Sequence, residues 1–249
     1  MEKNQKEVLR ILGNLGLTKA VPPTSPTSDV ICILGARTSS MVNRLKYAGE
    51  LYNKNKLQAK YLVLLTGERK VTVGVDGTEA ELSDIAEKYG VNISALTETH
   101  MMQESYSTSF LFQKLLTDLI DVPAGELPRP TTETTLQEFC KWLKSHPDVR
   151  SVSFVSNQPH VKYQQAVITE VLHQQSQAIK FEVIGPETSP VADIQEIVGA
   201  LGSQIWAETP SVVSKIKLTT TDPESRKAFL ELYTKQPLIY KNVESLIKR

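Results

Sequence analysis

Short apolar runs alternate with amphipathic segments over most of this chain. The runs that predict buried strands are residues 29–36, 61–65, 151–156 and 179–185. Between them, apolar residues recur every three or four positions, for example over 41–52, which is typical of one face of a helix. Strands that alternate with helices predict a mostly parallel sheet covered on both faces, which is a Rossmann-like three-layer α/β/α fold.

The segment between the second and third of these runs gives further signals. A helix is predicted after Thr78, because Thr78 and Glu81 fit a capping box and Gly90 is a suitable C-terminal stop. Residues 91–96 predict a short strand. Apolar residues at near-helical spacing over 103–120 predict another helix.

The domain organisation follows from the same patterns. Residues 1–20 predict an N-terminal helix, and the proline- and serine-rich stretch 21–28 predicts a linker. Residues 29–249 predict a single α/β domain, with a helical C-terminal extension over 210–249. We find no internal repeat.

Composition narrows the classes of function. The 28 lysines and arginines balance the 28 aspartates and glutamates, so the overall positive field typical of nucleic-acid binding is absent and no nucleic-acid partner is expected. The first residues do not fit a signal peptide, and no run approaches the roughly 18 apolar residues of a membrane span. We therefore expect no membrane span and a cytoplasmic location. The histidines and cysteines show no ligand spacing, so no metal site is expected.

In parallel sheets, ligands bind beyond the carboxyl ends of the strands, which directs attention to three loops. The first, "LGARTSS", combines Gly35, which would admit a ligand close to the backbone, with Arg37 and Arg44, which could meet an anion at the start of a helix. A tight turn with two solvated arginines explains the same residues equally well.

The second loop begins with "TGER" and ends at the predicted helix start. Gly67 would admit a ligand, and Glu68 could act as a base or accept a hydrogen bond from a ribose hydroxyl. Glu79 is a candidate acid or base, but a carboxylate in the first turn of a helix is also explained by the helix dipole.

The third loop is "VSNQPH". Asn157 offers amide contacts, and His160 follows Pro159, which suits the first turn of a helix. The positive end of a helix favours a neutral imidazole that can exchange a proton, although a lone histidine there is commonly structural. No motif for nucleophilic catalysis is present.

The order of these loops resembles the YdcF/SanA/ElyC-like family, a domain family of largely unassigned function. The matching elements are "DVICILG" at 29–35, "RLKYA" with Arg44, Thr66 to Glu68, Glu79 with Ala80, "TTET" with Thr131 and Glu133, and "VSNQPH" with His160. The chain differs at Glu68, where the family has a second glycine, and at Tyr163, where it has an arginine. The segment between the matched elements is longer than usual, which implies an insertion near 97–130.

The resemblance implies a Rossmann-like fold with a polar pocket at the strand ends. Some members are described as binding a nucleotide-like molecule such as S-adenosylmethionine, and others are linked to envelope assembly through a membrane anchor. This chain resembles the soluble branch. The resemblance also adds Thr131 to the candidate ligand-binding residues and Glu133 to the candidate catalytic ones.

The leading hypothesis is a protein that binds a small polar ligand, nucleotide-like or phosphate-bearing, at the strand ends. Its candidate catalytic residues are Glu79, Glu133 and His160, and its candidate ligand-binding residues are Gly35, Arg37, Arg44, Gly67, Glu68, Thr131 and Asn157. A hydrolase and a transferase both stay open, because no motif fixes a reaction. The alternative is a protein-interaction or regulatory factor that uses segments 97–129 and 210–249.

Overall fold

A computed structural model describes most of the chain up to residue 187. The described residues are 10, 13–14, 16–109, 112, 115–125, 129–187 and 200. The predicted C-terminal extension, 210–249, and most of the predicted N-terminal helix lie outside the described residues.

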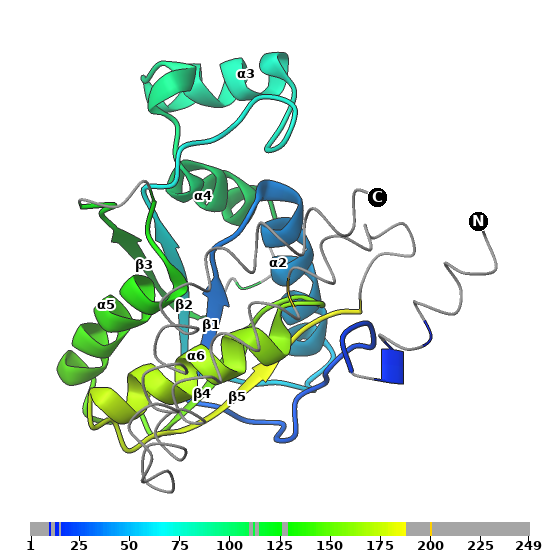
Figure 1. The fold of residues 1–249 in the computed structure, drawn as a ribbon, viewed down its shortest axis with the longest axis vertical. Helices are drawn as coiled ribbons and strands as arrows, with labels where there is room; N and C mark the ends of the chain where they lie inside the picture. The colour runs from blue at the N-terminus through cyan, green and yellow to red at the C-terminus, as the bar shows by residue number, and fades with distance from the viewer. Residues whose placement is uncertain are drawn as a thin grey trace, which may run out of the picture.

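Five parallel strands form one sheet, which confirms the predicted Rossmann-like α/β fold (Figure 1). The strands are β1 (Val30–Leu34), β2 (Tyr61–Gly67), β3 (Leu116–Val122), β4 (Ser151–Val155) and β5 (Lys180–Ile184). Their order is β3-β2-β1-β4-β5, so the chain builds outward from β1 to β3 and then returns to the other side of β1. The switch point, where a ligand crevice is expected, therefore lies between β1 and β4.

Helices cover both faces of the sheet (Figure 1). They are α2 (Thr38–Asn53), α3 (Glu79–Tyr89), α4 (Glu98–Ser109), α5 (Thr132–Ser145) and α6 (Val161–Gln174), with a 3₁₀ turn η1 (Ile93–Ala95) before α4. The apolar faces of α2 and α4 pack on one side of the sheet, and those of α5 and α6 pack on the other. In Figure 1, α3 stands away from the strands, beyond the carboxyl end of the sheet.

Alternating side chains of the central strands supply both cores. Val30 and Cys32 of β1 point toward α5 and α6, whereas Ile31 and Ile33 point toward α2 and α4, and all four are fully buried. A strand that is apolar at every position can be satisfied only between two helical layers, which explains why β1 occupies the centre of the sheet.

The helix predicted around α3 is confirmed in detail. Thr78 and Glu81 form the expected capping box, and Gly90 ends the helix in the left-handed conformation with φ of 66°. Such a φ suits glycine because it has no Cβ.

The region after α3 differs from the sequence prediction. Residues 91–96 contain the 3₁₀ turn rather than a strand, and the predicted helix over 103–120 is instead the end of α4 followed by the edge strand β3. β3 pairs with β2 over its full length, from Leu116 opposite Tyr61 to Val122 opposite Gly67. An edge strand is only half buried, and here polar side chains interrupt the apolar alternation, so its pattern did not stand out. The segment predicted as an insertion thus includes α4 and a strand of the sheet.

Within the described residues, no helix is both long and apolar enough to cross a membrane.

Candidate functional site

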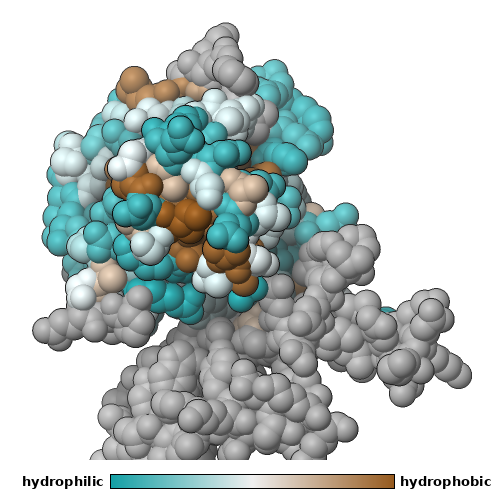
Figure 2. All heavy atoms as spheres, turned by 90° about the horizontal axis from the view of Figure 1, so that it is seen from above, coloured by the Kyte–Doolittle hydropathy of each residue, from teal (hydrophilic) through white to brown (hydrophobic). Residues whose placement is uncertain are grey.

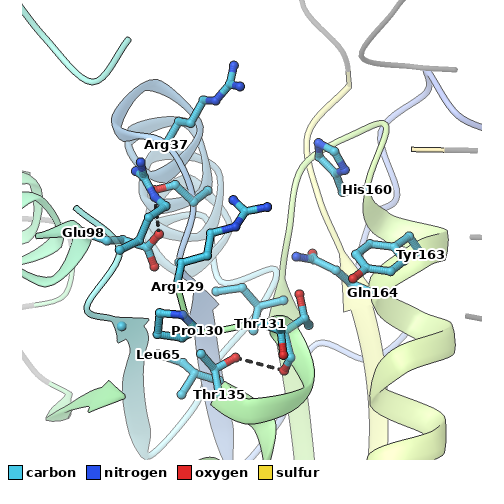
Figure 3. Close-up of a pocket in the computed structure, with 16 residues that line it drawn as sticks. Arg37, Leu65, Glu98, Arg129, Pro130, Thr131, Thr135, His160, Tyr163 and Gln164 are labelled. Carbon is cyan, nitrogen blue, oxygen red and sulfur yellow. Dashed lines mark hydrogen bonds and ion pairs between the residues drawn. The ribbon is translucent and has the colours of Figure 1, made fainter. Parts of the chain in front are cut away.

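A cavity of about 370 Å³ opens at the carboxyl ends of the strands (Figure 3). Its walls come from the loop between β1 and α2, the end of β2, the first turn of α4, the start of α5 and the start of α6. This is the edge at which parallel α/β sheets bind ligands, and it adjoins the switch point between β1 and β4. Several residues that are distant in sequence thus face one space.

Arg44 holds the strand ends together beneath this cavity. Arg44 is 2% exposed, and its guanidinium donates hydrogen bonds to Leu34 O at 2.7 Å, Gly35 O at 2.8 Å and the Asn157 side-chain oxygen at 2.7 Å. Burial lowers the pKa of Arg44 to about 10, although the Glu98 charge opposes that shift. Arg44 and Asn157 were predicted to bind ligand, but neither is among the residues that line the cavity. Together they fasten the end of β1 to the loop after β4.

Arg69 organises a second cluster at one wall. It contacts Asp76 through two hydrogen bonds of 2.7 and 3.0 Å, Glu98 through one of 3.0 Å, and the Ala36 carbonyl at 3.2 Å. The Asp76 carboxylate also accepts hydrogen bonds from the backbone N–H groups of Thr38 and Thr72. These contacts fix the loop after β2 against the start of α2.

The pKa values of the two carboxylates in this cluster are shifted in opposite directions. Burial alone would raise the pKa of Asp76, but the hydrogen bonds from Arg69 and from backbone N–H groups outweigh it, so the pKa is lowered. Glu98 is 8% exposed, and burial raises its pKa despite the hydrogen bond and charge of Arg69. Asp76 is therefore the carboxylate that stays ionised beside Arg69, and Glu98 is the one that is protonated more easily.

We expect Asp76→Asn to lower the free energy of unfolding by about 2–4 kcal/mol at neutral pH, because an amide would present donors to the Arg69 donors. A lowered native pKa gives stability that is present above the ordinary value of about 3.9 and is lost as pH falls through the native value. The deficit of the variant should therefore shrink below about pH 4. Urea unfolding measured from pH 7 to pH 3 checks this.

The control for that measurement is Asp84→Asn, since Asp84 is exposed on α3. It should change stability by less than about 0.5 kcal/mol at every pH. A deficit of Asp76→Asn that is equally large at low and neutral pH would contradict a native role for the ionised carboxylate.

Two glycines allow close approach at the cavity. A Cβ at Gly35 would overlap the Glu98 carboxylate and lie 3.1 Å from Leu65 O, and a Cβ at Gly67 would lie 2.6 Å from Pro130 Cγ. Both positions line the cavity, but the atoms that a Cβ would meet belong to the protein itself, so their role in admitting a ligand stays a prediction. The glycines let the β1 loop and the start of α5 approach neighbouring elements closely.

The open side of the cavity is basic. Its charged lining comprises three arginines, Arg37, Arg69 and Arg129, and one glutamate, Glu98. Arg69 is engaged with carboxylates, whereas Arg37 and Arg129 are exposed and have no ion-pair partner within the part of the chain that the structure describes. Figure 3 shows Arg129 reaching across the cavity toward the side that carries His160.

Three helices also begin at this cavity. Arg37 precedes α2, Thr131 precedes α5 and His160 precedes α6, and all three residues line the cavity. Thr131 caps α5 with its own side chain, whereas neither Arg37 nor His160 provides a side-chain cap to its helix. The dipole of a helix favours an anion at its start, so the three helix starts act in the same direction as the arginines, although Asp76 already accepts a hydrogen bond from the Thr38 N–H of α2 and Thr131 caps α5.

The structure places the predicted site residues in three groups. Those that line the cavity are Gly35, Arg37, Gly67, Thr131 and His160, and those that lie next to it in the fold are Arg44 and Asn157. The others, Glu68, Glu79 and Glu133, are exposed and are not among the lining residues. Of the three candidate catalytic residues, only His160 lines the cavity.

The positions of the other carboxylates have clear local causes. Glu68 accepts a hydrogen bond from the Ala124 backbone N–H at 3.1 Å, and Glu79 lies in the first turn of α3, which stands away from the sheet (Figure 1). Glu133 lies in the first turn of α5. Within "TGER", the cavity is lined by Gly67 and Arg69 rather than by Glu68.

Sequence reasoning missed seven polar residues of the lining: Arg69, Glu98, Arg129, Thr132, Thr135, Tyr163 and Gln164. Arg69 could have been found, because it follows a strand end in a loop already selected. Gln164 follows His160 by one helical turn, which places both on one face of α6. Glu98 and Arg129 carry no local signal, since they reach the cavity only through tertiary packing.

The exposed apolar side chains lie elsewhere. Val73 and Val75, in the loop before α3, are 50% and 46% exposed, and Leu116 at the start of β3 is 60% exposed. Figure 2 shows hydrophobic side chains among hydrophilic ones on the face that carries α3. Exposed apolar side chains are common on protein surfaces, so these alone do not define an interface.

Comparison with known proteins gives no relatives: no protein-family model matches the chain, and no curated protein matches it. Membership of the YdcF/SanA/ElyC-like family therefore stays a prediction from short motifs.

Proposed function

We propose that this protein binds a small, phosphate-bearing molecule in the cavity at the strand ends. The observation that carries the proposal is the pair of exposed guanidiniums, Arg37 and Arg129, which line the cavity and have no ion-pair partner within the described residues. The starts of α2, α5 and α6 at the same cavity support it.

Arginine suits this role because its planar guanidinium forms two parallel hydrogen bonds to a phosphate. Glu98 opposes an anion, and Arg69, which lies 3.0 Å from its carboxylate, offsets that charge only in part because it also pairs with Asp76. Burial also raises the pKa of Glu98, which favours its neutral form. The balance of charge around the cavity therefore favours an anionic ligand.

The volume of the cavity suits a ligand of modest size. A volume of about 370 Å³ lies toward the small end of the roughly 300–1,000 Å³ that ligand pockets span. A sugar phosphate or a mononucleotide is compatible with that range. S-adenosylmethionine fits the charge less well, because its sulfonium is positive and faces a lining that contains three arginines.

The chemistry of a bound phosphate ester would depend on few groups. His160 and Glu98 are the histidine and the carboxylate that line the cavity, so they are the candidates to move a proton in a hydrolase or a transferase. The described residues include no group of three or more histidine, cysteine, aspartate or glutamate side chains that could hold a metal ion. Binding is the part of the function that the geometry supports.

We expect Arg129→Ala to weaken binding of inorganic phosphate and of adenosine monophosphate roughly 10- to 100-fold, because a charge-assisted hydrogen bond contributes about 1.5–3 kcal/mol. The native fold should be unaffected, since Arg129 is exposed. Titration calorimetry gives the affinities, and thermal unfolding with saturating ligand provides a second reading by mass action.

Lys180→Ala is the matched control, because Lys180 is an exposed cation at the start of β5, on the opposite edge of the sheet. It should bind both ligands as the wild type does. If the wild type binds neither ligand at low salt, or if a double variant of Arg37 and Arg129 binds them unchanged, the proposal is wrong.

No specific observation favours the alternative hypothesis, a protein-interaction factor. Segment 97–129 contains α4 and β3, which are structural parts of the domain, and segment 210–249 lies outside the described residues.

A further inference from the structure

Gln164 carries a buried side-chain oxygen without a hydrogen-bond partner among the described residues. It lies one turn into α6, is 6% exposed, and its side-chain oxygen has no partner among the described residues. The backbone N–H of Gln164 donates to His160 O at 2.9 Å, so the helix does not require the side chain. The carboxamide is therefore available for another contact.

An unsatisfied buried acceptor is unusual in a native protein. More than about 90% of buried polar groups have a partner, and leaving one without costs about 1–3 kcal/mol. Leucine or methionine would fill the same volume on α6 without that cost. A buried acceptor that lacks a partner in the free protein can receive one from a ligand.

The carboxamide is directed toward the ligand space. Gln164 lines the cavity, and Figure 3 shows it pointing from α6 toward Arg129 and Thr131. Its oxygen is therefore a hydrogen-bond acceptor at the same cavity as the Arg129 guanidinium, which favours an anion. One molecule that satisfies both must present a hydrogen-bond donor near a negative group.

We propose that Gln164 determines specificity by accepting a hydrogen bond from a hydroxyl of the ligand, which makes the ligand a phosphate ester of a polyhydroxylated molecule. This inference rests on the proposed function, because Arg37 and Arg129 would hold the phosphate. A sugar phosphate and the ribose of a nucleotide share this chemistry, so the ligand series below separates them.

The central comparison of the test uses two probes that differ only in their hydroxyls. Adenosine monophosphate is compared with its 2′,3′-dideoxy analogue, and ribose 5-phosphate and inorganic phosphate complete the series. We expect the wild type to bind adenosine monophosphate roughly tenfold or more tightly than the dideoxy analogue, since a site built for a hydroxyl rejects a ligand that lacks it. Equal affinity for ribose 5-phosphate would assign the contact to the sugar phosphate alone.

Gln164→Met removes the acceptor with little change in volume. It should reduce the ratio of the two affinities to about one while leaving inorganic phosphate binding unchanged, and it should not lower the melting temperature, because no native hydrogen bond is lost. Gln165→Met is the matched control, since Gln165 is the next residue on α6 and is not among the lining residues. It should keep the wild-type ratio.

The outcomes separate the two proposals. If phosphate binds but the wild type does not discriminate between the nucleotide and its dideoxy analogue, the role of Gln164 is wrong and the anion site stands. If Gln164→Met weakens inorganic phosphate as much as the nucleotide, the side chain serves the phosphate and the hydroxyl inference is likewise wrong. If no probe binds the wild type, both proposals fail.

Discussion

Replacing Arg44 by methionine is expected to lower the free energy of unfolding by about 3–5 kcal/mol, because it leaves several buried acceptors without a donor. The guanidinium now satisfies two carbonyls at the end of β1 and the side-chain oxygen of Asn157. Leu34 and Asn157 are themselves buried, so their oxygens have little access to water once the guanidinium is removed. Urea unfolding followed by circular dichroism gives the difference directly.

Two comparisons make this result specific. Lys46→Met removes a cation from an exposed position of the same helix and should change stability by less than about 0.5 kcal/mol. Arg44→Lys keeps the charge but loses the planar arrangement of donors, so its free energy of unfolding should lie between the values of the wild type and Arg44→Met. If the free energy of unfolding of Arg44→Met lies within about 1 kcal/mol of the wild-type value, the hydrogen bonds of Arg44 between β1 and the loop after β4 are not needed for stability.

Gly35→Ala is expected to remove phosphate binding and to destabilise the fold by about 2–3 kcal/mol. The new Cβ would overlap the Glu98 carboxylate, which Arg69 holds at 3.0 Å, and would lie 3.1 Å from the backbone oxygen of Leu65. Because neither neighbour can move without breaking a hydrogen bond, the loop that carries Arg37 would have to shift.

The control is Gly77→Ala, where the nearest atom to the added Cβ is Leu82 Cδ2 at 3.3 Å, the end of a flexible side chain. It should cost less than about 1 kcal/mol and leave phosphate binding unchanged. Chemical unfolding and phosphate titration of both variants test the prediction. If Gly35→Ala binds phosphate as the wild type does, the close approach of Gly35 to Glu98 has no part in shaping the site.

Part of the candidate site was predictable because the fold class fixes where strand ends meet. Once strands were assigned before Gly35, Gly67 and Asn157, the rule for parallel sheets placed the three loops at one edge. That rule selects loops but not side chains. Within the second loop it could not distinguish Glu68, which turns to the Ala124 backbone, from Arg69, which lines the cavity.

The rest could not be predicted because its contacts join distant positions. Arg69 and Glu98 are 29 residues apart, and Arg44 and Asn157 are 113 apart. No local pattern states that one guanidinium will be buried as a clamp while another stays at a cavity. Burial decides whether an arginine has a structural role or lines the cavity, and burial depends on which helices pack over the strand ends.

The sequence by itself determined that four apolar runs form strands alternating with helices, that the fully apolar strand β1 is buried, and that α3 has a capped start, because these depend on local periodicity and backbone geometry. The tertiary structure alone decided that Arg44 is a structural clamp, that β3 forms an edge of the sheet, and that Arg129 and Gln164 share one cavity. The physical reason is that solvation and hydrogen-bond satisfaction are properties of the folded surroundings of a side chain, and neighbours in sequence specify them only weakly.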